Sequence, residues 1–215
     1  MDELELLKSR WRSQEQKLPR LTYDEIYKML LKKSSSIVKW IFFISIGEML
    51  LWTGLAFLVP ESSQRFTNEV GLSDIMIIAN VLFYLVFICF ILLFYRNYRK
   101  ISTTDTVKGL MENIIRTRRT VNYFIIYNLV STGVMLLGVN IFYYNNQDLV
   151  FRLMVEDYGV LPTMDQNQFF TTFFLVQLIL GAVVITLIFF FYKLVYGRLL
   201  KRLNKNYQEL KKIEV

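Results

Sequence analysis

One ionisable side chain, Glu48, lies near the middle of an otherwise apolar stretch of this chain. A carboxylate in an apolar environment is costly if it is charged and unpaired, so Glu48 must be protonated or must find hydrogen-bond partners. A transport site would use such a group to bind a proton or a cation, whereas a structural role would make it a polar contact between helices. We favour the structural role because transport sites usually contain further ionisable groups or a broken helix, and the apolar stretches contain no proline.

Uncharged polar residues are the candidate partners of Glu48. Ser45 lies one helical turn before Glu48 and shares its face, and three others occupy later apolar stretches at compatible depth. The predicted intramembrane polar cluster comprises Glu48, Ser45, Ser131, Thr132 and Gln177. We expect Asn128 to lie nearer the cytoplasm than this cluster.

The residue types of the chain exclude several kinds of catalytic site. There are no histidines and a single cysteine, Cys89, so neither an internal disulfide nor a Ser/His or Cys/His nucleophile pair can form. A metal site that uses histidine is excluded for the same reason. Intramembrane aspartyl proteases need paired aspartates, and the apolar stretches contain none. We therefore expect no enzymatic activity, no cofactor and no bound metal.

Four apolar stretches, which contain Glu48 and its candidate partners, are each long enough to cross a membrane. Hydrophobic residues make up 54% of the 215 residues, above the roughly 45–50% typical of soluble domains, and the mean hydropathy is +0.36. Crossing a bilayer takes about 20 helical residues. The predicted spans are 37–59, 75–95, 123–144 and 170–192. We predict an all-α fold, an integral membrane four-helix bundle with cytoplasmic helical extensions.

Lysine and arginine are distributed very unevenly among the segments outside these spans. They number nine in residues 1–39, which include Lys39 at the edge of the first span, and one, seven, one and seven in residues 60–74, 96–122, 145–169 and 193–215. The positive-inside rule therefore places residues 1–36, 96–122 and 193–215 in the cytoplasm, and the loops 60–74 and 145–169 outside.

The basic segments are expected to lie close to the cytoplasmic membrane surface, where they attract anionic lipid head groups. Nucleic-acid binding is disfavoured because no aromatic-basic binding motif accompanies the charge. Aromatic residues near the ends of the spans fit an interfacial belt. They are Trp40, Tyr95, Tyr123, Tyr143, Tyr144 and Tyr192.

The cytoplasmic segments are themselves predicted to be helical. Thr22 and Glu25 have the spacing of a capping box that opens a helix. The three serines at 34–36 are expected to weaken or bend this helix before the first span. Asp105 is the predicted N-cap of a helix that runs on into the third span.

Apolar residues recur at helical spacing in the N-terminal and C-terminal segments, and these are the candidate partner-binding residues. They are Leu4, Leu7, Trp11, Ile26, Met29, Leu30, Leu203, Tyr207 and Leu210. One interpretation is that these stripes pack on one another as an extension of the bundle. The other is that one stripe receives a protein partner. We favour the first because each stripe needs an apolar surface to cover it.

The sequence over 4–8, Trp11, 18–29 and 32–41 resembles the start of a family of uncharacterised bacterial four-span inner-membrane proteins. The resemblance implies a bacterial inner-membrane location. Members of that family are sometimes labelled carotenoid-cleaving oxygenases, an activity that implies iron held by histidines, so we reject it for this chain. The layout also distantly resembles membrane anti-sigma regulators, whose cytoplasmic N-terminal segment holds a partner.

Three functions are therefore under consideration. The first is a non-enzymatic inner-membrane protein that presents cytoplasmic helices to a protein partner, in signalling or regulation. The alternative is a small transporter or channel subunit that uses Glu48, acting as a homo-oligomer if it forms a pore. The third is a scaffold subunit of a larger membrane complex.

Overall fold

The computed structural model describes residue 5, residues 22–157, residue 159 and residues 165–214. Every regular element within these residues is a helix. The helices that are long and apolar enough to cross a membrane are α2 (Tyr23–Phe57), α4 (Ser73–Ser102), α5 (Val107–Asn145) and α7 (Gln166–Glu214). The prediction of an all-α fold with four helices of membrane-spanning length is confirmed.

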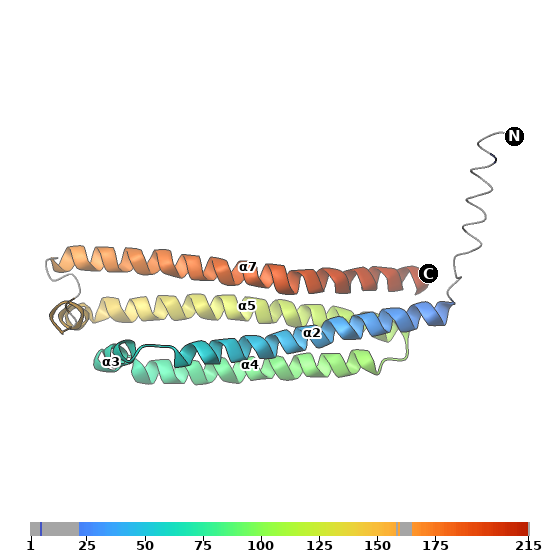
Figure 1. Ribbon diagram of the computed structural model, residues 1–215, viewed down its shortest axis with the longest axis horizontal. Coiled ribbons are helices and arrows are strands. Elements are labelled where there is room, and N and C mark those ends of the chain that lie inside the picture. The colour runs from blue at the N-terminus through green and yellow to red at the C-terminus, as the bar shows by residue number, and fades with distance from the viewer. Residues whose placement is uncertain (1–4, 6–21, 158, 160–164, 215) are drawn as a thin grey trace.

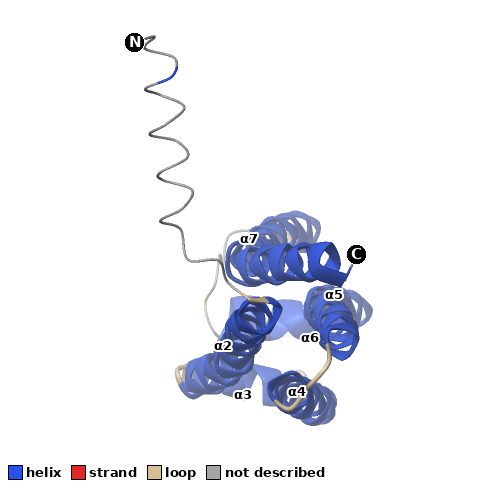
Figure 2. Ribbon diagram, turned by 90° about the vertical axis from the view of Figure 1, so that its right-hand side faces the viewer, coloured by secondary structure: helices blue, strands red, loops and turns tan. Residues whose placement is uncertain are grey.

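The four long helices form an up-and-down bundle (Figures 1 and 2). α2 packs against α4 and α7, and α5 packs against the same two helices. The start of α2, the connection between α4 and α5, and the end of α7 lie together at one end, which we call the basic end. The opposite, capped end carries the short elements α3 (Glu61–Glu69), α6 (Gln147–Phe151) and the π-helical η1 (Arg152–Asp157).

The capping box that opens α2 forms as predicted. The Thr22 backbone amide donates a hydrogen bond to the Glu25 carboxylate at 2.8 Å, and the Glu25 amide donates to the Thr22 hydroxyl oxygen at 3.4 Å. The backbone hydrogen bond from Thr22 holds the pKa of the Glu25 carboxyl group below its usual range. The helix therefore begins where its orphan amide groups first find side-chain acceptors.

Thr22→Ala is expected to destabilise the first turn of α2 by about 1 kcal/mol, because the Glu25 amide loses its side-chain acceptor and the Glu25 carboxylate loses the Thr22 hydroxyl donor. Amide hydrogen exchange measured over residues 23–30 should accelerate, while exchange in the middle of α2 stays unchanged. Equal acceleration along the whole helix would contradict a local capping role.

Two local predictions can be compared with the structure. α2 runs without a break through the serines at 34–36, which were expected to weaken or bend it. Ser34 is buried, and its hydroxyl oxygen accepts a hydrogen bond from the Asn206 side-chain amide at 3.0 Å. The N-cap of α5 is Thr106 and not Asp105, since the Thr106 hydroxyl oxygen accepts from the Gly109 amide at 3.1 Å.

One apolar core runs from the middle of the bundle to the basic end. Aromatic rings dominate it within the spans, and aliphatic side chains continue it beyond them. The aliphatic residues that stay buried toward the basic end are Leu30, Ile101, Leu110, Ile114, Leu203 and Leu210. With 49 residues, α7 is about 74 Å long, more than twice the roughly 30 Å of a bilayer core. The bundle therefore continues as a packed structure beyond the predicted spans.

A second apolar cluster closes the capped end. Its buried residues are Val70, Leu72, Tyr143, Val150, Leu153, Phe169 and Phe170. They come from the short elements and from the adjoining ends of the long helices, so the short elements are packed onto the bundle. Tyr143 is only 8% exposed and belongs to this cluster, which corrects its assignment to an interfacial belt.

Candidate functional site

Glu48 is the centre of a buried polar contact between α2 and α7. Its side chain is 5% exposed. Tyr192 donates its hydroxyl to one carboxyl oxygen of Glu48, and Tyr196 donates to the other at 3.1 Å. Trp52, one turn further along α2, also lies near this carboxyl group. The contact joins helices whose interacting residues are separated by 144 positions in the sequence.

The predicted polar cluster does not form around Glu48. The hydroxyls of Ser131 and Thr132 donate to the Asn128 carbonyl at 3.1 and 2.8 Å, within their own helix. Ser45 is buried beside Glu48 on α2, but its hydroxyl donates to the Phe42 carbonyl at 2.8 Å. Backbone carbonyls one turn away are always available to a serine or threonine in a helix, and here they satisfy these hydroxyls.

Gln177 is the remaining member of the predicted cluster, and it also has no contact with Glu48. Its side-chain oxygen is buried and has no hydrogen-bond partner among the described residues. The two side chains lie at different positions along the bundle axis. Next to Gln177, one turn along α7, Gly181 faces Leu136 on α5. Glu48 instead contacts α7 at Tyr192 and Tyr196. Gln177 therefore lies about four to five turns nearer the capped end than the carboxyl group.

The relative depth of the helices explains why the partners were missed. Tyr192 closes the predicted fourth span, and its ring packs 6.1 Å from that of Phe124, near the start of the predicted third span. Glu48 is thus level with the basic ends of two other spans, although it lies in the middle of its own. The apolar stretches are offset along the bundle axis, and matching their midpoints gave the wrong neighbours.

Phe124 packs against both Tyr192 and Tyr196 and forms the centre, or hub, of an aromatic cluster. It is fully buried, and five aromatic rings surround it at centroid distances of 5.1 to 6.1 Å. These rings are Phe87, Phe90, Phe94, Tyr192 and Tyr196. Edge-to-face packing of this kind restricts ring rotation, so both hydroxyl groups stay directed at Glu48.

Sequence reasoning assigned Tyr192 to an interfacial belt and did not single out Tyr196. The structure buries both rings, with exposures of 2% and 0%. Their spacing of four residues places them on one face of α7, and that spacing was the available signal. Since both groups carry a hydroxyl, they are the donors that a carboxyl group in an apolar core requires.

The chemistry of this site is recognition of one carboxyl group by two phenols. Two hydroxyl donors, one for each oxygen, stabilise Glu48, and no lysine or arginine among the described residues forms an ion pair with it. The arrangement ties the first membrane-spanning helix to the last and thereby closes the ring of four helices. Among the described residues, no group of three histidine, cysteine or acidic side chains is placed to hold a metal ion.

The candidate partner-binding residues divide into three groups. Leu4, Leu7 and Trp11 lie outside the described residues. Five others are buried in the core or packed against it, namely Ile26, Leu30, Leu203, Tyr207 and Leu210. The stripes that carry them cover one another, which was the favoured interpretation. Met29 is 58% exposed and is available to a partner.

Side-chain hydrogen bonds link neighbouring helices outside the spans. Asn97 on α4 donates to the Thr120 hydroxyl oxygen on α5 at 3.1 Å. Arg118 on α5 donates to the Asn204 side-chain oxygen on α7 at 2.7 Å. Together with the contact between Ser34 and Asn206, these bonds connect the four helices near the basic end, where polar groups fix the register of the apolar core.

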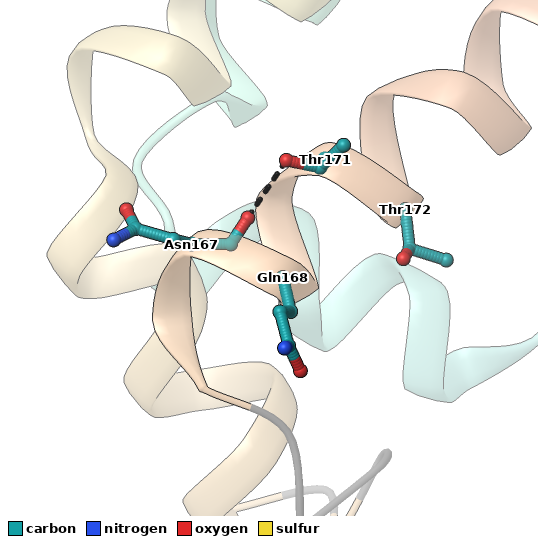
Figure 3. Close-up of a pocket in the computed structure, with 4 residues that line it drawn as sticks. All are labelled: Asn167, Gln168, Thr171 and Thr172. Carbon is teal, nitrogen blue, oxygen red and sulfur yellow. Dashed lines mark hydrogen bonds between the residues drawn. The ribbon is translucent and has the colours of Figure 1, made fainter.

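The capped end carries a shallow hollow on the first turns of α7, lined by Asn167, Gln168, Thr171 and Thr172 (Figure 3). Thr171 donates its hydroxyl to the Asn167 carbonyl at 2.8 Å. The side chains of Asn167, Gln168 and Thr172 point in different directions and are exposed. They do not converge on a common point, so this hollow is a weaker candidate site than Glu48.

Comparison with known proteins gives a family but no activity. A family model described as "Domain of unknown function (DUF8845)" matches residues 24–215. No curated protein and no solved structure matches the chain. The match extends over the four long helices and both ends of the bundle, and it agrees with the resemblance to an uncharacterised family.

Proposed function

We propose that this chain, which belongs to the DUF8845 family, is a non-enzymatic protein of the bacterial inner membrane that presents its basic end to a cytoplasmic protein partner. The observation that carries the proposal is the continuation of the bundle beyond the spans as a packed extension. We place this extension in the cytoplasm because it holds nearly all the basic residues of the chain.

The extension has the properties of a preformed docking surface. Its core residues Leu30, Ile114 and Leu203 are at most 5% exposed, so the helices cover one another without help from a partner. A surface that is already rigid loses little conformational freedom on binding. The basic residues at the ends of the spans, such as Lys39, Arg96 and Lys193, would contact anionic lipid head groups. These contacts would keep the extension projecting from the membrane surface.

A second candidate function is transport by a small carrier or channel subunit, and the buried carboxyl group of Glu48 favours it. Intramembrane carboxyl groups can bind a proton or a cation. The two tyrosine hydroxyls that contact Glu48 instead supply the donors that a purely structural carboxyl group needs. The third candidate, a scaffold subunit, would place the lipid-facing surfaces of the spans against other membrane proteins.

The proposal is tested by purifying the tagged full-length protein in a gentle detergent and identifying the proteins that accompany it. We expect a soluble protein in stoichiometric amount. It should be lost on removal of residues 1–20 and retained in Glu48→Gln, because the Glu48 side chain is buried between α2 and α7 and is not exposed to a partner.

Other outcomes would overturn this assignment in distinguishable ways. A homo-oligomer without a partner would contradict the docking function and lead to proton-flux measurements on the natural chain and Glu48→Gln in liposomes. Stoichiometric integral membrane proteins would support the scaffold function instead.

A further inference from the structure

The outward face of α7 carries a row of exposed basic side chains beyond the spans, which Glu209 interrupts between Lys205 and Lys212. These residues recur at spacings of three, four and seven, which keeps them on one side of the helix. We call Arg198, Lys201, Arg202, Lys205 and Lys212 the α7 basic stripe. The opposite side of α7 is occupied by the core residues Leu203 and Leu210, so the stripe faces away from the bundle.

The charges of the stripe are largely uncompensated within the chain. Among the described residues, its one ion pair is between Lys205 and Glu209, at 4.0 Å. The Lys205 side chain is 75% exposed, and an exposed pair of this length contributes little. With Glu209 on the same face, the five basic side chains of the stripe leave a net charge of +4 (five minus one).

Lipid head groups account for only the membrane-proximal part of the stripe. Asn206 on α7 contacts Ser34 on α2, and the two helices run in opposite directions. Phe42 lies eight residues after Ser34, so it is level with a position eight residues before Asn206, about residue 198. The Phe42 ring also packs 5.8 Å from that of Tyr95, which closes the second predicted span. Arg198 therefore lies at the edge of the membrane.

The attraction of the membrane charge weakens along the stripe and is nearly lost at its distal end. Lys205 and Lys212 follow Arg198 by seven and fourteen residues, which correspond to about 10 and 21 Å along the helix. The Debye length at physiological ionic strength is about 8 Å. At Lys212 the attraction to the lipid surface has fallen to less than about a tenth of its value at Arg198.

We propose that the α7 basic stripe binds an acidic segment of a protein, which makes carboxylate groups the recognised chemistry. The inference deepens the proposed docking function and rests on it. A protein is favoured over a nucleic acid because the stripe contains no exposed aromatic residue on which bases could stack. Met29, exposed on the neighbouring helix α2 near the level of Lys212, adds an apolar contact suited to a protein.

The test uses the full-length protein in nanodiscs of neutral phosphatidylcholine and a short fluorescent poly-L-glutamate peptide as the probe. The stripe variant carries Arg202→Gln, Lys205→Gln and Lys212→Gln. The matched control carries Lys28→Gln, Lys108→Gln and Arg116→Gln, which remove the same charge from exposed positions of α2 and α5. We expect the stripe variant to bind the peptide about tenfold more weakly and the control less than about twofold more weakly.

Several results would overturn the inference. Equal weakening in both variants would show non-specific attraction, and absence of binding to the natural chain would remove the site. Tighter binding of an oligodeoxythymidylate of equal charge, with the same dependence on the stripe, would assign the site to nucleic acid. Loss of peptide binding in phosphatidylglycerol nanodiscs would show that lipid occupies the stripe.

The two proposals can fail separately. If a co-purified soluble partner stays bound to the stripe variant, the stripe is not its site, whereas the docking function stands. If the peptide binds through the stripe but no soluble protein co-purifies with the natural chain, the docking function fails.

Discussion

Replacing Phe124 by alanine is expected to lower the free energy of unfolding of the bundle by about 3–5 kcal/mol. The side chain is fully buried, and its ring contacts five other aromatic rings from α4 and α7. Alanine would leave a cavity that these rings cannot fill without leaving their preferred packing. The loss should also free Tyr192 and Tyr196, which Phe124 positions against Glu48.

The loss of stability at Phe124 can be measured by SDS titration of the protein in mild-detergent micelles, followed by circular dichroism. Phe190→Ala is the matched control, since Phe190 is 51% exposed on the same bundle. We expect this control to change the unfolding midpoint little, because its ring contacts lipid or detergent in both the folded and unfolded states. Similar losses in the two variants would contradict the assignment of Phe124 as the hub.

The double variant Tyr192→Phe/Tyr196→Phe is expected to destabilise the bundle by about 2–3 kcal/mol. Both rings keep their packing, but Glu48 loses both hydroxyl donors and remains buried. An unsatisfied carboxyl group in an apolar core bears the full cost of its desolvation. The same SDS titration measures the effect, with Tyr95→Phe/Tyr123→Phe as the control at exposed positions.

Substitution of Glu48 separates the cost of the unsatisfied carboxyl group from any other effect of removing the two hydroxyls. Glu48→Leu in the background of the double variant should recover most of the lost stability, because an apolar side chain needs no donor. The same substitution in the natural chain should be destabilising, since it leaves two buried hydroxyls without an acceptor. If the double variant is as stable as the natural chain, the tyrosine hydroxyls do not support Glu48, and a functional role for the carboxyl group gains weight.

The sequence alone predicted the helical fold, the number of membrane-spanning helices and the prominence of Glu48. These features follow from local properties, namely the length of apolar stretches and the position of a charge inside an apolar stretch. The capping box at Thr22 was predicted for the same reason, because capping depends on residues within one helical turn. Each of these inferences needs only neighbours in the sequence.

The tertiary structure decided which residues meet Glu48 and which apolar stripes remain exposed. Tyr192 and Tyr196 are remote from Glu48 in the sequence, and they reach it because the apolar stretches are offset along the bundle axis. Hydropathy marks where a helix can enter a membrane, but it does not set the axial register of one helix against another. That register comes from side-chain packing around Phe124 and from polar contacts such as Ser34 with Asn206, and both depend on the folded bundle.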